Sequence, residues 1–363
     1  MRILFLIQRP QARGAELFAC HLGEGLIQKG HEVSLITLFE GDFDLPFSGK
    51  IHHLKRNPST RFFDFGAWKS IHEIIRSFNP DIVQAMGADT LKFMVFSQLV
   101  FGWKGKMIFY NGSLISRYIR SNSVRLFNQW LYKRIDGIVA VSKASKLDFE
   151  NLFSFRFPHE VIPVGILKSD KFSLKDPFPN PVLVHIGGFT FEKNHPELLR
   201  VFSGVLAIKP DAKLLMIGEG PLRSQIQELA EQKGLSDSVS FLGAHSEPFS
   251  LVPKNAILVL PSKIEGMPAV IGEAFINRIP VVAYDVGAIS ELLKTNITGW
   301  LIPAGEPDTM VEAILDLTEM KTNDLSGILD AAEQFARENL DIKQVAAHYE
   351  EYYSKLLSDP SLR

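Results

Sequence analysis

The sequence predicts an α/β protein made of two doubly wound domains, each with a parallel sheet between layers of helices. The chain has 363 residues, a length typical of two domains. Short apolar runs that are typical of buried parallel strands recur along it, with helical segments between them. The clearest run, Ala256–Leu260 (AILVL), is followed by a helical segment that ends near Asn277 and then by a second buried run.

The first half begins with a strand–helix–strand unit. Arg2–Ile7 is expected to be a strand, and the apolar rhythm from about Ala15 to Lys29 predicts a helix that ends at Gly30. Glu32–Leu38 is the second strand, and a right-handed parallel crossover follows from this order. Later strands are expected at 80–86, 106–110, 136–142 and 161–165.

The second half repeats the alternation after a segment rich in Lys, Asp and Pro. This segment, 167–180, is expected to be a linker between a first domain (1–166) and a second domain (181–340). Strands are expected at 181–188, 212–217, 238–243, 256–260 and 279–287. From Asp308 onward the chain is expected to be helical, and 341–357 forms a last amphipathic helix.

The composition is that of an ordinary globular protein with a net charge of −2. The single cysteine, Cys20, excludes a disulfide framework, fits a reducing compartment and is expected to be a packed thiol. The first apolar stretch is too short for a signal peptide, and no run approaches the roughly 20 residues that span a bilayer. We therefore expect a cytoplasmic protein.

The charge is divided unevenly along the chain. Residues 1–165 contain 21 Lys and Arg against 14 Asp and Glu, whereas the remainder contains 18 against 27. The basic excess lies mainly within 104–134, where aromatic residues interleave with the cations. This mixture suits an anionic membrane surface, such as the inner face of the membrane, or a charged acceptor. A solvated basic helix face is an equally open alternative, and no nucleic-acid motif supports nucleic acid as a partner.

The stretch after Ala256–Leu260 carries the most chemistry. Strand, short loop and helix start, with Pro268 suited to the first helical position, present free backbone N–H groups to a ligand such as a phosphate. Glu265 lies in the loop and Glu273 inside the helix, so both carboxylates can flank one ligand at different depths. The alternative is an ordinary strand–helix unit with two surface carboxylates.

This stretch resembles the donor-site signature of retaining glycosyltransferases with the GT-B fold, family four. The resemblance rests on Glu265-Gly-Met-Pro, Glu273-Ala and the following Pro-Val-Val-Ala-Tyr-Asp-Val-Gly. It implies that Glu273 holds the ribose hydroxyls of a sugar nucleotide and that Glu265 approaches the sugar. The residues between them contact the sugar and the diphosphate; they include Gly266, Met267, Pro268 and Ala269.

Other segments resemble the same family. Lys193 matches the lysine that grips the donor diphosphate, and Gly14 belongs to the family's Gly-Gly-Ala-Glu loop. Leu242 lies in the strand whose end touches the nucleobase. The chain departs from the family at Gly188, where an arginine is usual, and at Arg13, where a glycine is usual. It also has Met86 and Asn111-Gly112 where the family often places histidines.

The resemblance implies two Rossmann-like domains facing across a cleft, with a last helix (341–363) packing back on the acceptor-side first domain. It implies a hexosyltransferase that moves a sugar from a nucleotide sugar, expected to be a UDP-sugar, to a glycan or lipid-linked acceptor with retained configuration. Lys193 and Glu265 would act in catalysis, with no cofactor and no metal. Polysaccharide or lipid-linked glycan synthesis is the expected setting.

Three alternatives accompany this hypothesis. Asp42-Phe-Asp44 resembles the metal-binding pair of the other main glycosyltransferase fold, but its position beside Gly41 and Pro46 favours a solvated turn. A sugar-nucleotide epimerase would share the architecture. A non-catalytic glycosyltransferase-like subunit is suggested by Arg13, Gly188 and the absent histidines.

Overall fold

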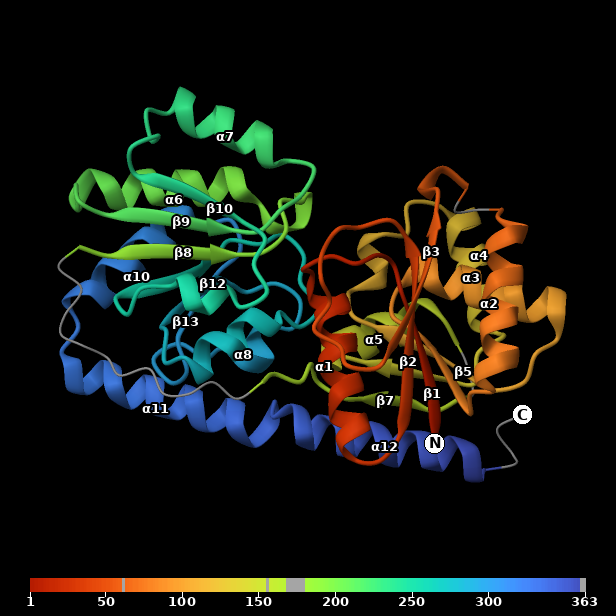
Figure 1. Cartoon of the computed structure of the whole chain (residues 1–363). Coiled ribbons are helices and arrows are strands. Elements are labelled where there is room, and N and C mark those ends of the chain that lie inside the picture. The colour runs from red at the N-terminus through yellow and green to blue at the C-terminus, as the bar shows by residue number, and fades with distance from the viewer. Residues whose placement is uncertain (61–62, 155–156, 168–179, 360–363) are drawn as a thin grey trace. The chain divides into compact units, whose positions relative to one another are not determined.

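The computed structural model describes residues 1–60, 63–154, 157–167 and 180–359, and the chain divides into two compact units (Figure 1). Unit 1 comprises Met1–Gly165 and Ile342–Arg363, and unit 2 comprises Ile166–Asp341. Nearly all of the predicted linker, 168–179, lies outside the described residues. The units are described separately below.

The described residues of unit 1 form a seven-stranded parallel sheet in the order β3-β2-β1-β4-β5-β6-β7. The strand order reverses between β1 and β4, which pair directly with Leu4 opposite Val83. The strands are β1 (Arg2–Ile7), β2 (Glu32–Phe39), β3 (Lys50–Arg56), β4 (Ile82–Ala85), β5 (Lys106–Asn111), β6 (Gly137–Ala140) and β7 (His159–Val161).

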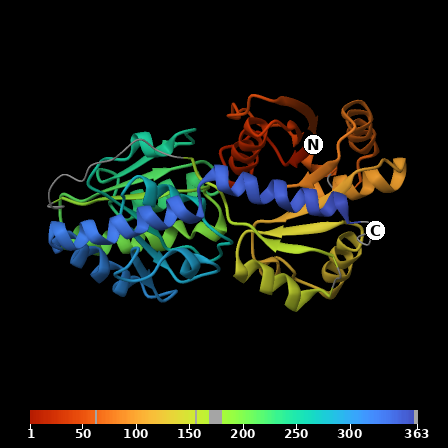
Figure 2. The ribbon, with the colours of Figure 1, turned by 90° about the horizontal axis from the view of Figure 1, so that it is seen from below.

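Helices cover both faces of this sheet. They are α1 (Gly14–Gln28), α2 (Phe65–Phe78), α3 (Ala88–Phe101), α4 (Asn122–Tyr132), α5 (Lys143–Leu152) and α12 (Ile342–Ser358). The helix α12 lies beside α1, where Phe18 contacts Tyr349 (Figure 2). The Tyr353 hydroxyl donates to Gln84 Oε1 at 2.7 Å, so a buried hydrogen bond ties α12 to the central strand β4. Cys20 is buried in α1, as expected for a packed thiol.

The described residues of unit 2 form a six-stranded parallel sheet in the order β10-β9-β8-β11-β12-β13. Its order reverses between β8 and β11, which are neighbours in the sheet. The strands are β8 (Val182–Ile186), β9 (Lys213–Ile217), β10 (Val239–Gly243), β11 (Ala256–Leu260), β12 (Val281–Tyr284) and β13 (Trp300–Ile302).

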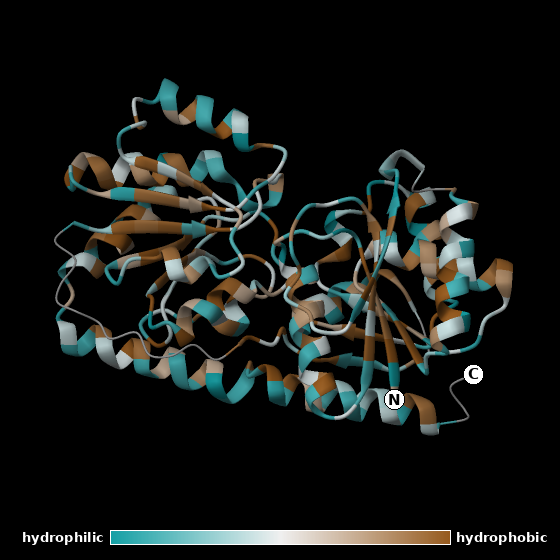
Figure 3. Ribbon diagram, in the orientation of Figure 1, coloured by the Kyte–Doolittle hydropathy of each residue, from teal (hydrophilic) through white to brown (hydrophobic). Residues whose placement is uncertain are grey.

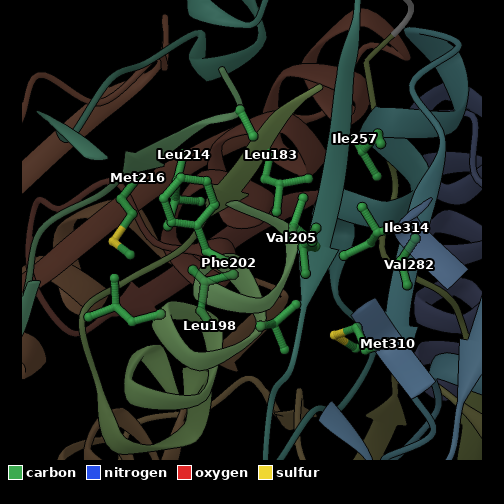
Figure 4. Close-up of a cluster of buried hydrophobic side chains, with 14 of the residues drawn as sticks. Leu183, Leu198, Phe202, Val205, Leu214, Met216, Ile257, Val282, Met310 and Ile314 are labelled. Atoms are coloured by element: carbon green, nitrogen blue, oxygen red, sulfur yellow. The ribbon is translucent and has the colours of Figure 1, made fainter. Parts of the chain in front are cut away.

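Two apolar clusters sandwich this second sheet. The helices are α6 (His195–Ile208), α7 (Arg223–Gln232), α8 (Ala269–Ile276), α9 (Ile289–Leu292), α10 (Pro307–Glu319) and α11 (Thr322–Asn339). One cluster joins the sheet to α6 and α10, and Figure 4 shows Phe202 of α6 packed beside Leu183 and Leu214. The other cluster joins it to α8 and α11. The inner strands are therefore largely buried on both faces, as their apolar runs predicted (Figure 3). The edge strand β10 is partly exposed.

The structure differs from the predicted elements in several places, and one of them is the strand β13, which was not predicted. The strand expected at 161–165 is β7, His159–Val161, and it ends before Pro163, which has no N–H to donate to a ladder. The edge strand β3 was not predicted, because its seven residues mix charged and apolar side chains and are partly exposed. Pro268 precedes α8 with an extended backbone (φ −73°, ψ 108°), so the helix begins one residue later than expected.

Candidate active site

The candidate site of unit 2 lies where the strand order reverses. In open α/β sheets, ligands bind outside the carboxyl ends of the strands at such a switch point. The loop after β8 leads through a 3₁₀ turn, η3 (Phe191–Lys193), into α6, and the loop after β11 leads into α8. Both loops leave the same edge of the sheet from neighbouring strands. Lys193 and Glu265, which lie 72 residues apart in sequence, meet there.

The centre of the site is a hydrogen-bonded ion pair. Lys193 Nζ donates to Glu265 Oε1 at 2.7 Å, and the Glu265 side chain is only 7% exposed. Ser262 Oγ donates to the same oxygen at 2.7 Å and is itself buried. Two donors therefore hold one carboxylate oxygen in a fixed direction. Ser262 was not predicted, although its position three residues before an acid at the end of a strand was a usable signal.

Further hydrogen bonds tie the two loops to each other. Asn194 takes a left-handed backbone conformation (φ 54°) between η3 and α6, and its Nδ2 donates to the Pro261 carbonyl at 3.1 Å. The N–H of Lys263 donates to the Glu192 carbonyl at 2.7 Å. These contacts set the spacing between the β8 loop and the β11 loop. Hydrogen bonds between the two loops therefore hold the Lys193–Glu265 pair in place.

The start of α8 and Glu273 form the second part of the site. Pro268 lies just before α8, Ala269 is its first residue, and the first N–H groups of a helix have no intrahelical partner. Glu273 lies one turn further along the same helix. Among the described residues, no hydrogen bond or ion pair reaches its carboxylate, and burial raises its pKa to about 7. A partly buried acid without a partner is suited to accept hydrogen bonds from a ligand.

The loop after the strand β12 requires a glycine where it approaches the Glu265–Gly266 segment. The N–H of Ala288 donates to the Gly266 carbonyl at 3.2 Å, which brings two loops together. Gly287 has φ +61°, and a Cβ at this position would lie 1.8 Å from the Glu265 carbonyl oxygen. Only glycine permits this approach. The position of Glu265 therefore depends on Gly287.

The other two predicted donor-site residues, Leu242 and Gly14, belong to other elements of the chain. Leu242, in β10, is 41% exposed and lies two strands from β8 in the sheet order. Gly14 belongs to unit 1, where it is the first residue of α1 and has open space at its Cβ position. Gly188 has no side chain to replace the family's arginine. Arg223 is paired with Glu219, and its Nη2 also donates to the Phe241 carbonyl at 3.4 Å.

Two buried histidines lie behind Lys193, and neither was predicted. His185 in β8 donates from Nδ1 to the Val259 carbonyl at 2.9 Å, and its ring meets that of His195 edge-on, with centroids 4.8 Å apart. His195 stacks on Phe189 at 4.2 Å. Burial, followed by the nearby Lys193 charge, lowers the pKa of His185 to about 4. Burial, followed by the charges of His185 and Lys193, lowers the pKa of His195 to about 2. Both rings are therefore neutral at physiological pH.

Unit 1 has its own cavity at its own switch point. It is about 300 Å³ in volume and lies between the loop after β1 and the loop after β4. Its lining includes Arg13, Glu16 and Asp89, together with the side-chain amides of Gln8 and Gln11. Burial raises the pKa of Glu16 to about 7, and Gln11 Nε2 donates to its carboxylate at 2.9 Å. Arg13 therefore adds a charge to this cavity, where the family usually has a glycine.

The predicted turn at Asp42-Phe-Asp44 is solvated. Both aspartates are exposed in a segment without regular structure. Within the described ranges, no group of three or more His, Cys, Asp or Glu side chains is arranged to hold a metal ion.

Comparison with known families identifies the class of protein. Residues 12–167 match the family model for glycosyltransferase family 4, and residues 168–337 match that for glycosyl transferases group 1. The two matches adjoin and together span residues 12–337, which is most of both units. The chain belongs to the group 1 glycosyltransferases of family four, and it is a glycosyltransferase.

Individual relatives are distant but match over most of their length. The N-acetyl-alpha-D-glucosaminyl L-malate synthase of Bacillus anthracis is 23% identical, with 96% of each chain covered. The amylovoran biosynthesis glycosyltransferase AmsD of Erwinia amylovora is 24% identical, over 78% of this chain and 81% of the relative.

Solved structures confirm the GT-B fold. Anabaena HepE in complex with UDP and glucose superimposes with a TM-score of 0.80 at 20% identity, covering 98% of this chain and 100% of that one. A Staphylococcus aureus TarM mutant in complex with Fondaparinux, alpha-GlcNAc-glycerol and UDP gives a TM-score of 0.80 at 14% identity, covering 99% and 100%. The predicted two-domain α/β class is therefore correct.

Proposed function

We propose that this glycosyltransferase moves a hexose from a UDP-sugar to an acceptor hydroxyl and retains the anomeric configuration. The observation that carries the proposal is the Lys193–Glu265 pair at the switch point of unit 2, next to the start of α8. Glu273 lies on the same loop–helix segment, and its carboxylate has no hydrogen bond or ion pair with any described residue. This arrangement offers a cation and helix N–H groups to a diphosphate and carboxylates to hydroxyl groups. The presence of UDP in the HepE and TarM complexes supports uracil as the base of the donor.

In the proposed reaction, the bond between the sugar C1 and the diphosphate oxygen breaks as the acceptor oxygen bonds to C1 from the same face. The diphosphate leaves with the electron pair, and the acceptor proton passes to a phosphate oxygen. Lys193 and the first N–H groups of α8 stabilise the departing charge, which is the largest electrostatic demand of the step. Glu265 orients the sugar and stabilises positive charge near C1. Glu273 accepts hydrogen bonds from the ribose hydroxyls.

Replacing Glu273 by glutamine should weaken UDP binding and raise the melting temperature. Hydrogen bonds to a charged group are stronger than those to an amide, so the loss should be roughly 10- to 100-fold in affinity. The pKa of Glu273 is raised to about 7 in the folded protein, so ionising it destabilises the fold as pH rises from about 4.5 through 7. The neutral amide of glutamine does not ionise, so it avoids this loss of stability. Titration calorimetry and differential scanning calorimetry check both effects.

The exposed Glu312 of α10 provides the matched control, because Glu312→Gln should change neither quantity. UDP affinity of the unaltered protein should fall as pH drops below about 7, since the charged form of Glu273 binds the ribose. An affinity for UDP that Glu273→Gln leaves unchanged would remove the ribose role. Parallel titrations with GDP and ADP test the base, and tighter binding of either would replace UDP in the proposal.

We propose that catalysis needs no metal ion, because Lys193 and the N–H groups at the start of α8 supply the positive charge that a bridging cation would otherwise provide. Addition of EDTA should leave the transfer rate unchanged. Loss of turnover on chelation, with recovery on adding back Mg²⁺ or Mn²⁺, would contradict this part of the proposal.

We also propose that the acceptor is a glycan or lipid-linked glycan and that the protein works in the cytoplasm at the inner face of the membrane. Two matches with polysaccharide names support the acceptor class: amylovoran biosynthesis AmsD and the Vi polysaccharide biosynthesis protein VipC/TviE of Salmonella typhi, which is 24% identical over 45% of this chain and 29% of that one. The basic excess of 104–134 supports the location. Among the described residues, no helix has the length and apolarity needed to cross a bilayer.

A further inference from the structure

Exposed apolar side chains concentrate on one part of unit 1. Half of the exposed large hydrophobic residues in the described part of the chain lie between Phe63 and Phe127. They come from the start of α2, the end of α3, and the segment from η2 (Ile115–Arg117) through α4, and they include Phe63, Phe65, Leu99, Val100, Leu126 and Phe127. A concentration of this kind on one unit marks an interaction surface rather than ordinary scattered exposure.

Ring contacts connect the three helices that carry most of these residues. Phe65 of α2 lies 5.7 Å from Phe101 of α3, and Trp68 of α2 stacks on Phe96 of α3 at 5.2 Å. Phe96 in turn lies 6.5 Å from Phe127 of α4. The three helices lie next to one another in unit 1 (Figure 1), and these ring contacts join them. We call the exposed residues of α2, α3, η2 and α4 the α2–α4 surface.

The α2–α4 surface is strongly basic where α4 joins it. No Asp or Glu occurs between Asp89 and Asp136, whereas eight Lys and Arg do. Five of these cations are exposed: Lys104, Arg117, Arg120, Arg125 and Lys133. Within the described ranges, Arg117 and Arg120 have no side-chain hydrogen bond or ion pair. Their charges are therefore available to a partner.

The helix α4 has the form of an interfacial helix. Its first two turns, Asn122–Phe127, are exposed throughout, so little of the unit covers them. At its end, Arg134 stacks over the Trp130 ring at 3.7 Å, so a cation and an aromatic ring share one location. An anionic bilayer surface binds apolar and aromatic side chains that lie beside cationic ones. The apolar and aromatic side chains enter the headgroup region, and the cationic side chains pair with lipid phosphates.

We propose that the α2–α4 surface is the docking surface of this protein for an anionic lipid bilayer. The inference rests on the proposed location of the transferase at a membrane and identifies the residues that make the contact. A protein partner would need a matching acidic face with apolar pockets, whereas a bilayer of anionic lipid supplies negative charge and an apolar layer together. Residues 90–135 contain no acid, and the exposed Glu73 of α2 lies 3.9 Å from Lys69, so the surface remains basic and favours the lipid.

The test is co-sedimentation of the full chain with vesicles of phosphatidylcholine alone or mixed with phosphatidylglycerol. We expect binding to the mixed vesicles only, weakened by high salt. Arg117→Gln with Arg120→Gln should lower the partition constant roughly 25-fold, because each basic side chain near an anionic surface contributes about fivefold. Leu126→Ser, at a side chain that is 64% exposed, should also reduce it.

Matched controls come from unit 2. Lys233→Gln with Lys254→Gln removes two exposed cations, and Ile208→Ser alters an apolar side chain that is 60% exposed; neither should change vesicle binding. UDP affinity, measured on every variant, separates this proposal from the proposed reaction. Intact UDP binding without vesicle binding would overturn the docking surface and the membrane location, and would leave the proposed reaction standing. Equal binding to both vesicle types would also overturn the docking surface. A dimer in solution that Leu126→Ser dissociates would overturn it as well, because a second copy of the chain would then cover the surface.

Discussion

Replacing Lys193 by alanine should lower the rate of glycosyl transfer by roughly 100- to 1,000-fold, the usual cost of removing one preorganised group that stabilises developing negative charge. Lys193 is held by Glu265 at 2.7 Å and lies beside the loop that leads to α8. With Gly188 in place of the family's arginine, more of the diphosphate charge depends on this lysine. The effect should appear mainly in kcat, because the charge grows as the bond to the diphosphate breaks.

The control for this variant is Lys254→Ala, an exposed lysine just before β11, at the opposite edge of the same sheet. It should transfer sugar at the normal rate. Differential scanning calorimetry must accompany the assay, since Lys193→Ala leaves the largely buried Glu265 without its counterion. A folded Lys193→Ala protein with normal kcat would contradict the charge-stabilising role. An unaltered protein that binds UDP but transfers no sugar to any acceptor would favour the non-catalytic subunit.

Replacing Gly287 by alanine should abolish most activity and destabilise unit 2. The left-handed backbone at Gly287 costs a residue with a side chain about 1–2 kcal/mol, and the added Cβ would lie 1.8 Å from the Glu265 carbonyl oxygen. The loop that carries Glu265 must move to relieve this overlap. A displacement of about 1 Å at a reacting group can cost roughly 100-fold in rate. The transfer assay and the melting temperature both report it.

Gly327 in α11 is the matched control for Gly287. Its Cβ position has no neighbour within 4 Å, and it lies inside an α-helix, so Gly327→Ala should stabilise the protein by about 0.5–1 kcal/mol without changing activity. If Gly287→Ala retained full activity, the position of Glu265 would not depend on the close approach of the two loops.

The fold could be predicted where the chemistry of burial leaves a strong pattern. Ala256–Leu260 was predicted to the residue because a strand covered on both faces is apolar throughout. The edge strand β3 could not be, since its exposed side chains break that pattern. The roles of Lys193, Glu265 and Glu273 were inferred from the family resemblance. The matches to the two family models confirm that the chain belongs to the family, and the roles of these three residues stay predictions.

The supporting residues of the site were missed for a different reason. Ser262, Asn194 and His185 are single polar residues whose partners lie far away in sequence or across a turn. Their function depends on which strands are neighbours, and the order β8-β11 is a property of the folded sheet. Periodicity within one segment carries no information about such pairs. The aromatic contacts between α2, α3 and α4 are of the same kind.

The two donors on Glu265 have a stereochemical consequence. Lys193 and Ser262 both occupy Oε1, so Oε2 is the carboxylate oxygen that remains to accept a hydrogen bond from a sugar. An acceptor oxygen with a fixed direction can take a hydrogen bond from a sugar hydroxyl in the equatorial position or from one in the axial position. It cannot take one from either epimer equally well unless the sugar ring moves. In the proposed reaction, Glu265 would therefore select the configuration at one sugar carbon as well as stabilise charge near the anomeric centre.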